Sequence, residues 1–299
     1  MSLDVKNSEA PDTTAAATPA TAAPPPAATT KAPRSSAWKS WDALWPKVLA
    51  VAIAVGIWQA IVLSGWKTTT ILPPPTEALG KLVELLGTSK YWETIQLTMT
   101  RGVIGFLAAL AVGTILGIAC SQWKVLRAAV GSMITGLQTM PSIAWFPLMI
   151  LFFGLTETAI FAVIILGAAP SVANGILSGI DDTPPQLLRA GHMLGARGWA
   201  RYRYVILPAA LPSYLSGLKQ GWAFAWRSLM AGELLVPIAQ KSSLGYDMTI
   251  ARQFLQSDRL IAIMITILVL GMVVDALFSA LANRVRRNRG LTGLSATAG

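Results

Sequence analysis

Six apolar stretches of membrane length recur along this chain, and they limit its possible folds more than any other feature. They cover residues 46–65, 101–120, 126–154, 158–180, 213–236 and 260–282. A helix needs about 20 mostly apolar residues to cross the roughly 30 Å hydrocarbon layer. Within lipid, only helices and closed barrels satisfy every backbone hydrogen-bonding group. The sequence therefore predicts an all-α, polytopic membrane protein with about six transmembrane helices.

The composition supports this prediction. Hydrophobic residues make up 54% of the 299 residues and charged residues 13%, and the mean hydropathy is +0.55. These values lie outside the range of soluble globular domains.

Two stretches have irregular features. A helical segment from Tyr91 leads into the second stretch, and the third contains Pro141 and Pro147. Proline interrupts the helical hydrogen-bond ladder, so we expect one span followed by a kinked or partly re-entrant continuation. Between the first two stretches, residues 76–87 alternate apolar and charged side chains at helical spacing, after three consecutive prolines. They predict an amphipathic helix at the outer surface.

The chain divides into four regions by composition. Residues 1–37 are dominated by Ala, Pro and Thr and predict a disordered cytoplasmic tail, since they contain no apolar run typical of a signal peptide. Residues 38–90 hold the first transmembrane helix and the outer amphipathic helix. Residues 91–289 form the core, with a long polar connection at 181–212, and residues 290–299 are expected to be a flexible C-terminus.

Basic residues indicate the orientation. In a six-span arrangement, one face collects most of them: Lys31, Arg34, Lys39, Lys47, Lys124, Arg127, Arg189, Arg197, Arg201, Arg203, Arg284, Arg286, Arg287 and Arg289. The positive-inside rule places that face, and with it both termini and the polar connection, in the cytoplasm. The net charge of +10 is mainly an orientation signal. We expect no nucleic-acid partner, because the charges are spread over short loops.

The polar connection predicts a helix, a turn and a second amphipathic segment. Thr183 before Pro184 is a favourable helix start. Leu187, Gly191 and Leu194 form one narrow apolar face. Gly195 is placed for a left-handed turn after this helix.

The second segment contains Trp199, Tyr202 and Val205, with arginines between them. We expect Pro208 and Pro212 to end it.

Chemical motifs that would indicate catalysis are missing from the sequence. It has no Gly-x-x-x-x-Gly-Lys-Ser/Thr phosphate loop, so ATP would have to bind elsewhere. Cys120 and His192 are the only residues of their types. Neither a disulfide nor a metal-ligand set is expected, and Cys120 is interpreted as an apolar filler and His192 as an exposed residue. The sequence therefore predicts no catalytic, cofactor-binding or metal-binding residues on this chain, and no enzyme.

Ionisable residues within the apolar stretches are more informative, because such residues face protein or water. The fifth stretch carries Lys219, Arg227 and Glu233, and the sixth carries Asp275. Six residues turn a helix by about 240°, so Arg227 and Glu233 are expected to find partners elsewhere. Arg227 and Glu233 are candidates for a water-filled path that attracts an anion. The alternative is a structural ion pair, with Asp275 as a possible partner of Arg227.

The polar connection also has a specific spacing. Arg189, Ala190 and Gly191 are followed by Gly195, and then by Val205, Leu207 and Pro208. This spacing resembles the cytoplasmic coupling loop of permease subunits in bacterial binding-protein-dependent ABC importers. Segments 226–234, 243–246 and 251–258 resemble the nitrate, sulfonate and taurine branch. The resemblance extends over residues 94–289, about two-thirds of the chain.

The resemblance implies a type I ABC importer permease in the bacterial cytoplasmic membrane. It also implies that two copies form one path, that a cytoplasmic ATPase dimer binds ATP and docks on the coupling loops, and that an extracytoplasmic solute-binding protein delivers a small anion such as a sulfonate, taurine or nitrate. One position departs from the family pattern, which usually begins Glu-Ala-Ala where this chain has Arg189-Ala190-Gly191. The acidic contact with the ATPase is therefore missing or replaced.

Two other function classes remain open. A secondary transporter or channel would explain the spans, but it predicts an inverted repeat, which the sequence does not show. A membrane enzyme would need convergent catalytic groups, and the sequence offers no convincing set. Dependence of transport on a separate ATPase would distinguish an importer from both.

Overall fold

A computed structural model of the protein describes residues 36–238 and 241–288. The predicted tail, apart from its last two positions, and the predicted flexible C-terminus lie outside these residues. The chain forms two units, Met1–Ile53 and Ala54–Gly299. The boundary falls within helix α1 (Ser36–Leu63).

Secondary structure in the described ranges is helical and includes no strand, which confirms the all-α prediction. After α1 the order is α2 (Pro75–Leu86), α3 (Ser89–Gln122), α4 (Lys124–Thr139), the 3₁₀ turn η1 (Ser142–Trp145), α5 (Phe146–Phe153), α6 (Glu157–Asp181), α7 (Pro185–Met193), α8 (Trp199–Arg201), the π-helical turn η2 (Tyr202–Ile206), α9 (Leu207–Leu235), α10 (Leu244–Gln253) and α11 (Ser257–Asn288). The amphipathic helix expected at 76–87 is α2.

Four described helices are long and apolar enough to cross a membrane: Trp45–Leu63, Ser89–Gln122, Glu157–Asp181 and Ser257–Val285. A fifth span results if the bent pair Val125–Thr139 and Ser142–Phe153 counts as one, with an angle of 104° between its parts. The bend follows Met140 at Pro141, which confirms the predicted break, whereas Pro147 lies in the first turn of α5. The six predicted crossings are thus four or five by these criteria.

The remaining predicted span corresponds to α9. Its 29 residues would extend about 44 Å at 1.5 Å per residue, which is enough to cross the membrane. It is less apolar because it carries Lys219, Arg227 and Glu233. Length therefore supports α9 as a crossing, while its polar side chains require protein or water beside it.

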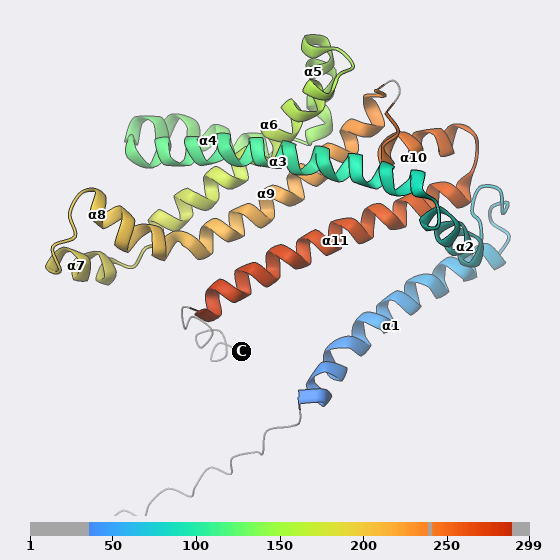
Figure 1. The fold of residues 1–299 in the computed structure, drawn as a ribbon, viewed down its shortest axis with the longest axis horizontal. Coiled ribbons are helices and arrows are strands. Elements are labelled where there is room, and N and C mark those ends of the chain that lie inside the picture. Colours follow the sequence, from blue (N-terminus) through green and yellow to red (C-terminus); the bar gives the residue numbers. More distant parts are fainter. Residues whose placement is uncertain (1–35, 239–240, 289–299) are drawn as a thin grey trace, which may run out of the picture. The chain divides into compact units, whose positions relative to one another are not determined.

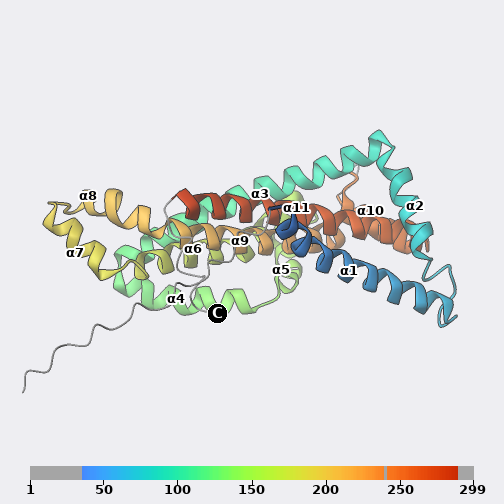
Figure 2. The same cartoon turned by 90° about the horizontal axis from the view of Figure 1, so that it is seen from below.

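Helix α6 lies at the centre of the packed core, between α3 and α9 (Figures 1 and 2). Ile160, Val163 and Ile164 of α6 are fully buried. Phe106 of α3 meets Trp222 of α9 edge to face, with 5.4 Å between the ring centroids. Such close van der Waals packing holds helices together within a membrane, where burial from water contributes little.

Glycines allow the helices in this core to approach closely. A Cβ atom added to Gly113 would lie 2.5 Å from the carbonyl oxygen of Ala169, and one added to Gly175 would lie 2.8 Å from Cα of Gly217. Real Cβ atoms do not approach this closely. The α3–α6 and α6–α9 contacts therefore depend on glycine at these positions.

Candidate functional site

The polar connection between α6 and α9 folds as a helix-turn-helix knob at one end of these two helices (Figure 1). Gly195 has φ +81°, as the predicted left-handed turn requires. The predicted Thr183 cap is wrong: its hydroxyl donates to the carbonyl oxygen of Gly179 at 3.0 Å. Pro184 takes the capping position without a side-chain bond, and α7 begins at Pro185.

The two halves of the knob meet at Gly191. This glycine is buried, and a Cβ atom on it would lie 2.7 Å from Cγ2 of Val205. The apolar face predicted for α7 is not buried as a unit, since Leu187 and Leu194 are exposed. Gly191 is the buried residue of α7, and a larger side chain at this position would not fit against Val205.

The prolines at the end of the connection do not stop a helix, contrary to the prediction. Pro208 lies in the first turn of α9 and Pro212 within the helix. The first turn of a helix tolerates proline because its amide has no helical partner. The π-helical turn η2 leads directly into α9 at Leu207. The interval 181–212 therefore includes the first residues of α9.

The knob presents apolar side chains to its surroundings. Met193 is 82% exposed and Leu194 88%. Arg189 lies beside them in α7 and is exposed, as is His192. Exposed apolar residues on a small protruding element are typical of a binding surface for another protein.

Glu233, one of the two candidate path residues, is fully buried and belongs to a polar cluster. Its carboxylate accepts hydrogen bonds from Thr98 at 3.0 Å and from the Arg101 guanidinium at 3.3 Å. The Arg101 side chain is 4% exposed and also binds Glu157 at 2.9 Å. Lys241 binds the same Glu157 oxygen at 2.9 Å. The cluster connects α3, α6 and α9 with the segment after α9.

The same cluster joins the segments that resemble the sulfonate branch. The amide of Gly245 donates to Glu233 at 3.1 Å, and the amide of Leu244 donates to the hydroxyl of Thr98 at 3.0 Å. Both amides lie at the start of α10, where helical amides have no partner within the helix. Glu233 therefore fixes the start of α10 against α3.

Arg101 is not among the residues predicted from the sequence, because it lies at the edge of the second apolar stretch, where a charged residue is expected. In the structure it lies a third of the way along α3, which begins at Ser89. The predicted helical lead-in from Tyr91 was the available signal. It implies that Arg101 lies inside the helix and needs a partner.

Arg227, the other candidate path residue, is exposed. Its Nε donates to the carbonyl oxygen of Ala223 in its own helix at 3.0 Å, and its guanidinium lies 4.7 Å from the centre of the Phe224 ring. The possible pair with Asp275 is not formed, because Asp275 binds Lys219 at 3.1 Å.

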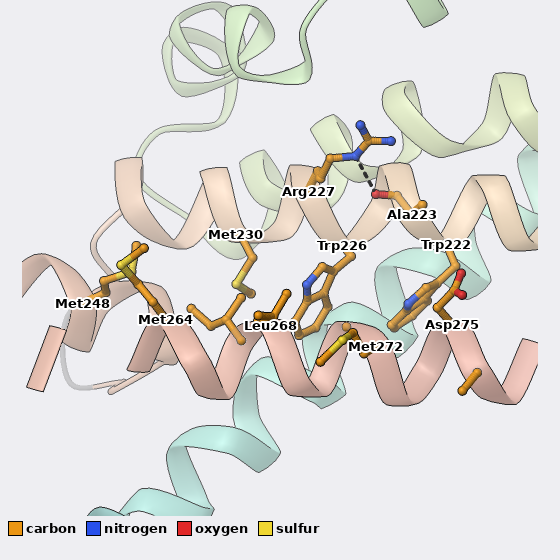
Figure 3. Close-up of a pocket in the computed structure, with 13 residues that line it drawn as sticks. Trp222, Ala223, Trp226, Arg227, Met230, Met248, Met264, Leu268, Met272 and Asp275 are labelled. Carbon is orange, nitrogen blue, oxygen red and sulfur yellow. Dashed lines mark hydrogen bonds between the residues drawn. The ribbon is translucent and has the colours of Figure 1, made fainter. Parts of the chain in front are cut away.

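Arg227 stands at the rim of a groove of about 650 Å³ between α9 and α11. Trp222, Trp226 and Met230 of α9 line this groove together with residues of α11. Figure 3 shows the guanidinium directed away from α11, whereas Trp226 and Met230 point toward it. The charged group of Arg227 therefore belongs to the other side of α9.

Residues 109–287 match the family model of the binding-protein-dependent transport system inner membrane component. The chain belongs to this family of ABC importer permeases. This permease is 29% identical to the taurine transport system permease protein TauC of Escherichia coli, over 81% of this chain and 91% of that protein. It is 30% identical to the putative aliphatic sulfonates transport permease protein SsuC of Bacillus subtilis, over 82% of this chain and 88% of that one.

A solved structure shows the same fold. "Crystal structure of an amino acid ABC transporter with histidines" matches 71% of the permease and covers 97% of that chain, with a TM-score of 0.55 and 19% identity. The fold is that of a type I ABC permease, and the protein is a multi-pass membrane transport subunit.

Proposed function

We propose that this permease carries a small sulfonate-type anion, such as taurine or an aliphatic sulfonate, into the cell in an ATP-driven importer. Two copies form the path, a cytoplasmic ATPase dimer binds and hydrolyses ATP, and an extracytoplasmic solute-binding protein delivers the anion. Both termini and the knob face the cytoplasm.

The knob carries this proposal. Gly191 packed on Val205 and the left-handed turn at Gly195 give it a fixed shape, and Met193 and Leu194 offer an apolar docking surface. A rigid, protruding element suits the transmission of movement from one subunit to another, because a flexible loop would absorb it. Arg189 takes the place of the family's acidic residue, so we expect the ATPase groove to contact it with a carboxylate or backbone oxygens.

The anion is supported by two observations. Relatives are named for taurine and aliphatic sulfonates. Arg227 has no carboxylate partner among the described residues and is exposed on a membrane-length helix. An exposed guanidinium at membrane depth is stabilised by water and by a passing anion. Glu233 is assigned a structural role, since its carboxylate is enclosed by Arg101, Thr98 and Gly245.

Reconstitution tests the proposal. The permease would be placed in liposomes with its ATPase and its solute-binding protein, and uptake of taurine, butanesulfonate and nitrate would be measured with and without ATP. We expect uptake of a sulfonate that requires ATP, the ATPase and the binding protein. Uptake by the permease alone would identify a secondary transporter or channel instead.

A further inference from the structure

The exposed side of α9 is polar throughout its middle part. Between Pro208 and Leu234, its exposed residues are Ser216, Gln220 and Arg227. Intervals of four and seven residues place these side chains on one side of a helix. The Ser216 hydroxyl donates to the Pro212 carbonyl oxygen of its own helix at 3.1 Å. This side of α9 thus offers hydrogen-bonding groups, not an apolar surface.

Two neighbouring helices show what a lipid-facing surface looks like in this protein. The exposed large residues in the middle of α3 include Ile104, Leu107 and Ile115, and those of α11 include Val269 and Val273. Such surfaces are compatible with hydrocarbon. The polar side of α9 is not, because unpaired polar groups in lipid cost free energy.

Helix α6 contributes polar groups to the same side. Helices α6 and α9 run in opposite directions (Figures 1 and 2) and touch at Gly175 and Gly217. The residue before a contact position and the residue three after it lie on one flank of their own helix. Because the two helices are antiparallel, these flanks of both helices face the same side of the pair. The residues in these positions are Asn174 and Ser178 on α6, and Ser216 and Gln220 on α9. Ser178 is also the exposed residue in the α6 segment from Ala159 to Ile180.

Helix α4 borders this side through Gln138. The Gln138 amide donates to the Ser171 hydroxyl at 3.1 Å and accepts from the Asn174 amide at 3.2 Å. These hydrogen bonds connect α4, the first part of the bent span, to α6. At the end nearest the knob, Arg127 of α4 and Asp181 of α6 form an ion pair. Polar contacts thus continue along this side up to the knob.

We propose that this polar face is the surface along which the permease conducts its anion, and that Gln220 is a specificity-determining residue. The polar face consists of Gln138, Asn174, Ser178, Ser216, Gln220 and Arg227. This proposal rests on the function proposed above and deepens it.

The chemistry of the polar face suits a compact oxyanion. Each of its three amides has two N–H donors, of which the hydrogen bonds described above use at most one, and Arg227 supplies one positive charge. None of its six residues is acidic. Several weak donors in a row allow an anion to move from one to the next, whereas a second fixed cation would hold it. Gln220 lies about 10 Å from Arg227 along the helix axis, so its amide is the next donor in that row.

Cysteine accessibility tests the proposal directly. Cys120 is the only cysteine and is buried, so Cys120→Ala provides the background. Ser216→Cys, Gln220→Cys and the lipid-facing controls Leu107→Cys and Val273→Cys would be made in the complex with ATPase, in membranes opened by freezing and thawing. The probe is 2-sulfonatoethyl methanethiosulfonate, itself a small sulfonate, applied with and without ATP. We expect Ser216→Cys and Gln220→Cys to be labelled about tenfold faster or more than the two lipid-facing controls, because lipid suppresses thiolate formation.

The charge of the probe gives a second measurement. At Gln220→Cys, the ratio of labelling by the sulfonate probe to labelling by its trimethylammonium analogue should fall about threefold or more when Arg227→Gln is added, since a nearby charge is removed. Leu107→Cys, on another face, should show no such change.

The outcomes separate the possible occupants of the polar face. Labelling no faster than at the lipid-facing controls, in both nucleotide states, overturns the proposal. Spontaneous disulfides between copies at both Ser216→Cys and Gln220→Cys, with no labelling, would show a closed contact between two permeases and also overturn it. These measurements do not depend on which solute is transported. Failure of sulfonate uptake with rapid labelling would therefore contradict the proposed substrate and leave the polar face as the conducting surface.

Discussion

Two arginines on membrane-length helices differ in what surrounds them, and this difference determines their roles. Arg101 is buried and shared between Glu157 and Glu233. Arg227 is exposed, and its bond goes to its own helix backbone. A buried charge that loses its partner is strongly destabilising, whereas an exposed one can be removed at little cost. Stability and transport should therefore respond to different residues.

Arg101→Met should destabilise the permease by about 3–5 kcal/mol, because it leaves the buried Glu233 carboxylate without its charge partner. Thermal unfolding of the purified protein in detergent measures this loss. Adding Glu233→Gln should recover part of it, since the uncompensated charge is then gone.

The matched control is Glu84→Gln, which removes the exposed Lys81–Glu84 pair of α2 and should change stability little. Equal losses in Arg101→Met and Glu84→Gln would show that the buried cluster has no special role.

Arg227→Gln should leave unfolding and assembly close to those of the natural protein and reduce sulfonate uptake by about tenfold or more, since loss of one charge-assisted hydrogen bond costs about 1.5–3 kcal/mol. This reduction would be measured as sulfonate uptake in liposomes that contain the whole complex. Uptake at the natural rate would remove Arg227 from the path, and loss of folded protein would give it a structural role.

Among the elements, the knob depends on two glycines for different reasons. Gly191 has no room for a side chain, because a Cβ atom would meet Val205. Gly195 has room, with nothing within 4 Å, but its φ of +81° is strained for other residues. A substitution at Gly195 therefore acts through the backbone and not through contacts.

Gly195→Val should uncouple ATP hydrolysis from uptake, because relief of about 1–2 kcal/mol of backbone strain turns the second half of the knob away from the first. ATPase stimulation and uptake would be assayed together in the reconstituted complex. Gly80→Val is the control, since that glycine of α2 also has nothing within 4 Å and has no positive φ. Normal coupling in a well-folded Gly195→Val protein would exclude the knob from coupling.

Helices α6 and α9 have a different neighbour at each end. The knob lies at one end of α6 and α9, and α2 and α10 lie toward the other end (Figures 1 and 2). Both ends expose apolar side chains, such as Leu187 and Leu194 on the knob and Leu79 on α2. If the knob receives the ATPase, changes at the two ends should affect assembly differently.

Leu187→Asp with Leu194→Asp should abolish copurification of the ATPase, because charged groups in an apolar docking surface lose contacts and must be desolvated. Leu79→Asp should retain it. Native mass spectrometry of the purified complexes measures the composition, and we expect two permeases with two ATPases in the natural form. ATPase retained at full stoichiometry on the double variant would place docking elsewhere.

The sequence by itself determined the features that depend on neighbouring residues. Apolar runs of membrane length predicted the helices, Pro141 predicted the break before η1, and Gly195 predicted the left-handed turn. Each follows from local hydropathy or from the backbone preference of one residue type. The spacing from Ala190 to Pro208 likewise identified the knob, since the connection folds largely on its own short segment.

Only the tertiary structure decided which distant groups meet. Arg101 and Glu233 are separated by 132 residues, and Asp275 binds Lys219 instead of Arg227. Pro208 fits the first turn of α9, which tolerates proline, and Pro212 lies inside α9 because packing of α9 against α6 outweighs the local tendency of proline to end a helix. The polar face also required the Gly175–Gly217 contact. A sequence pattern places polar residues on one side of a helix, but the direction of that side depends on how the helices pack together.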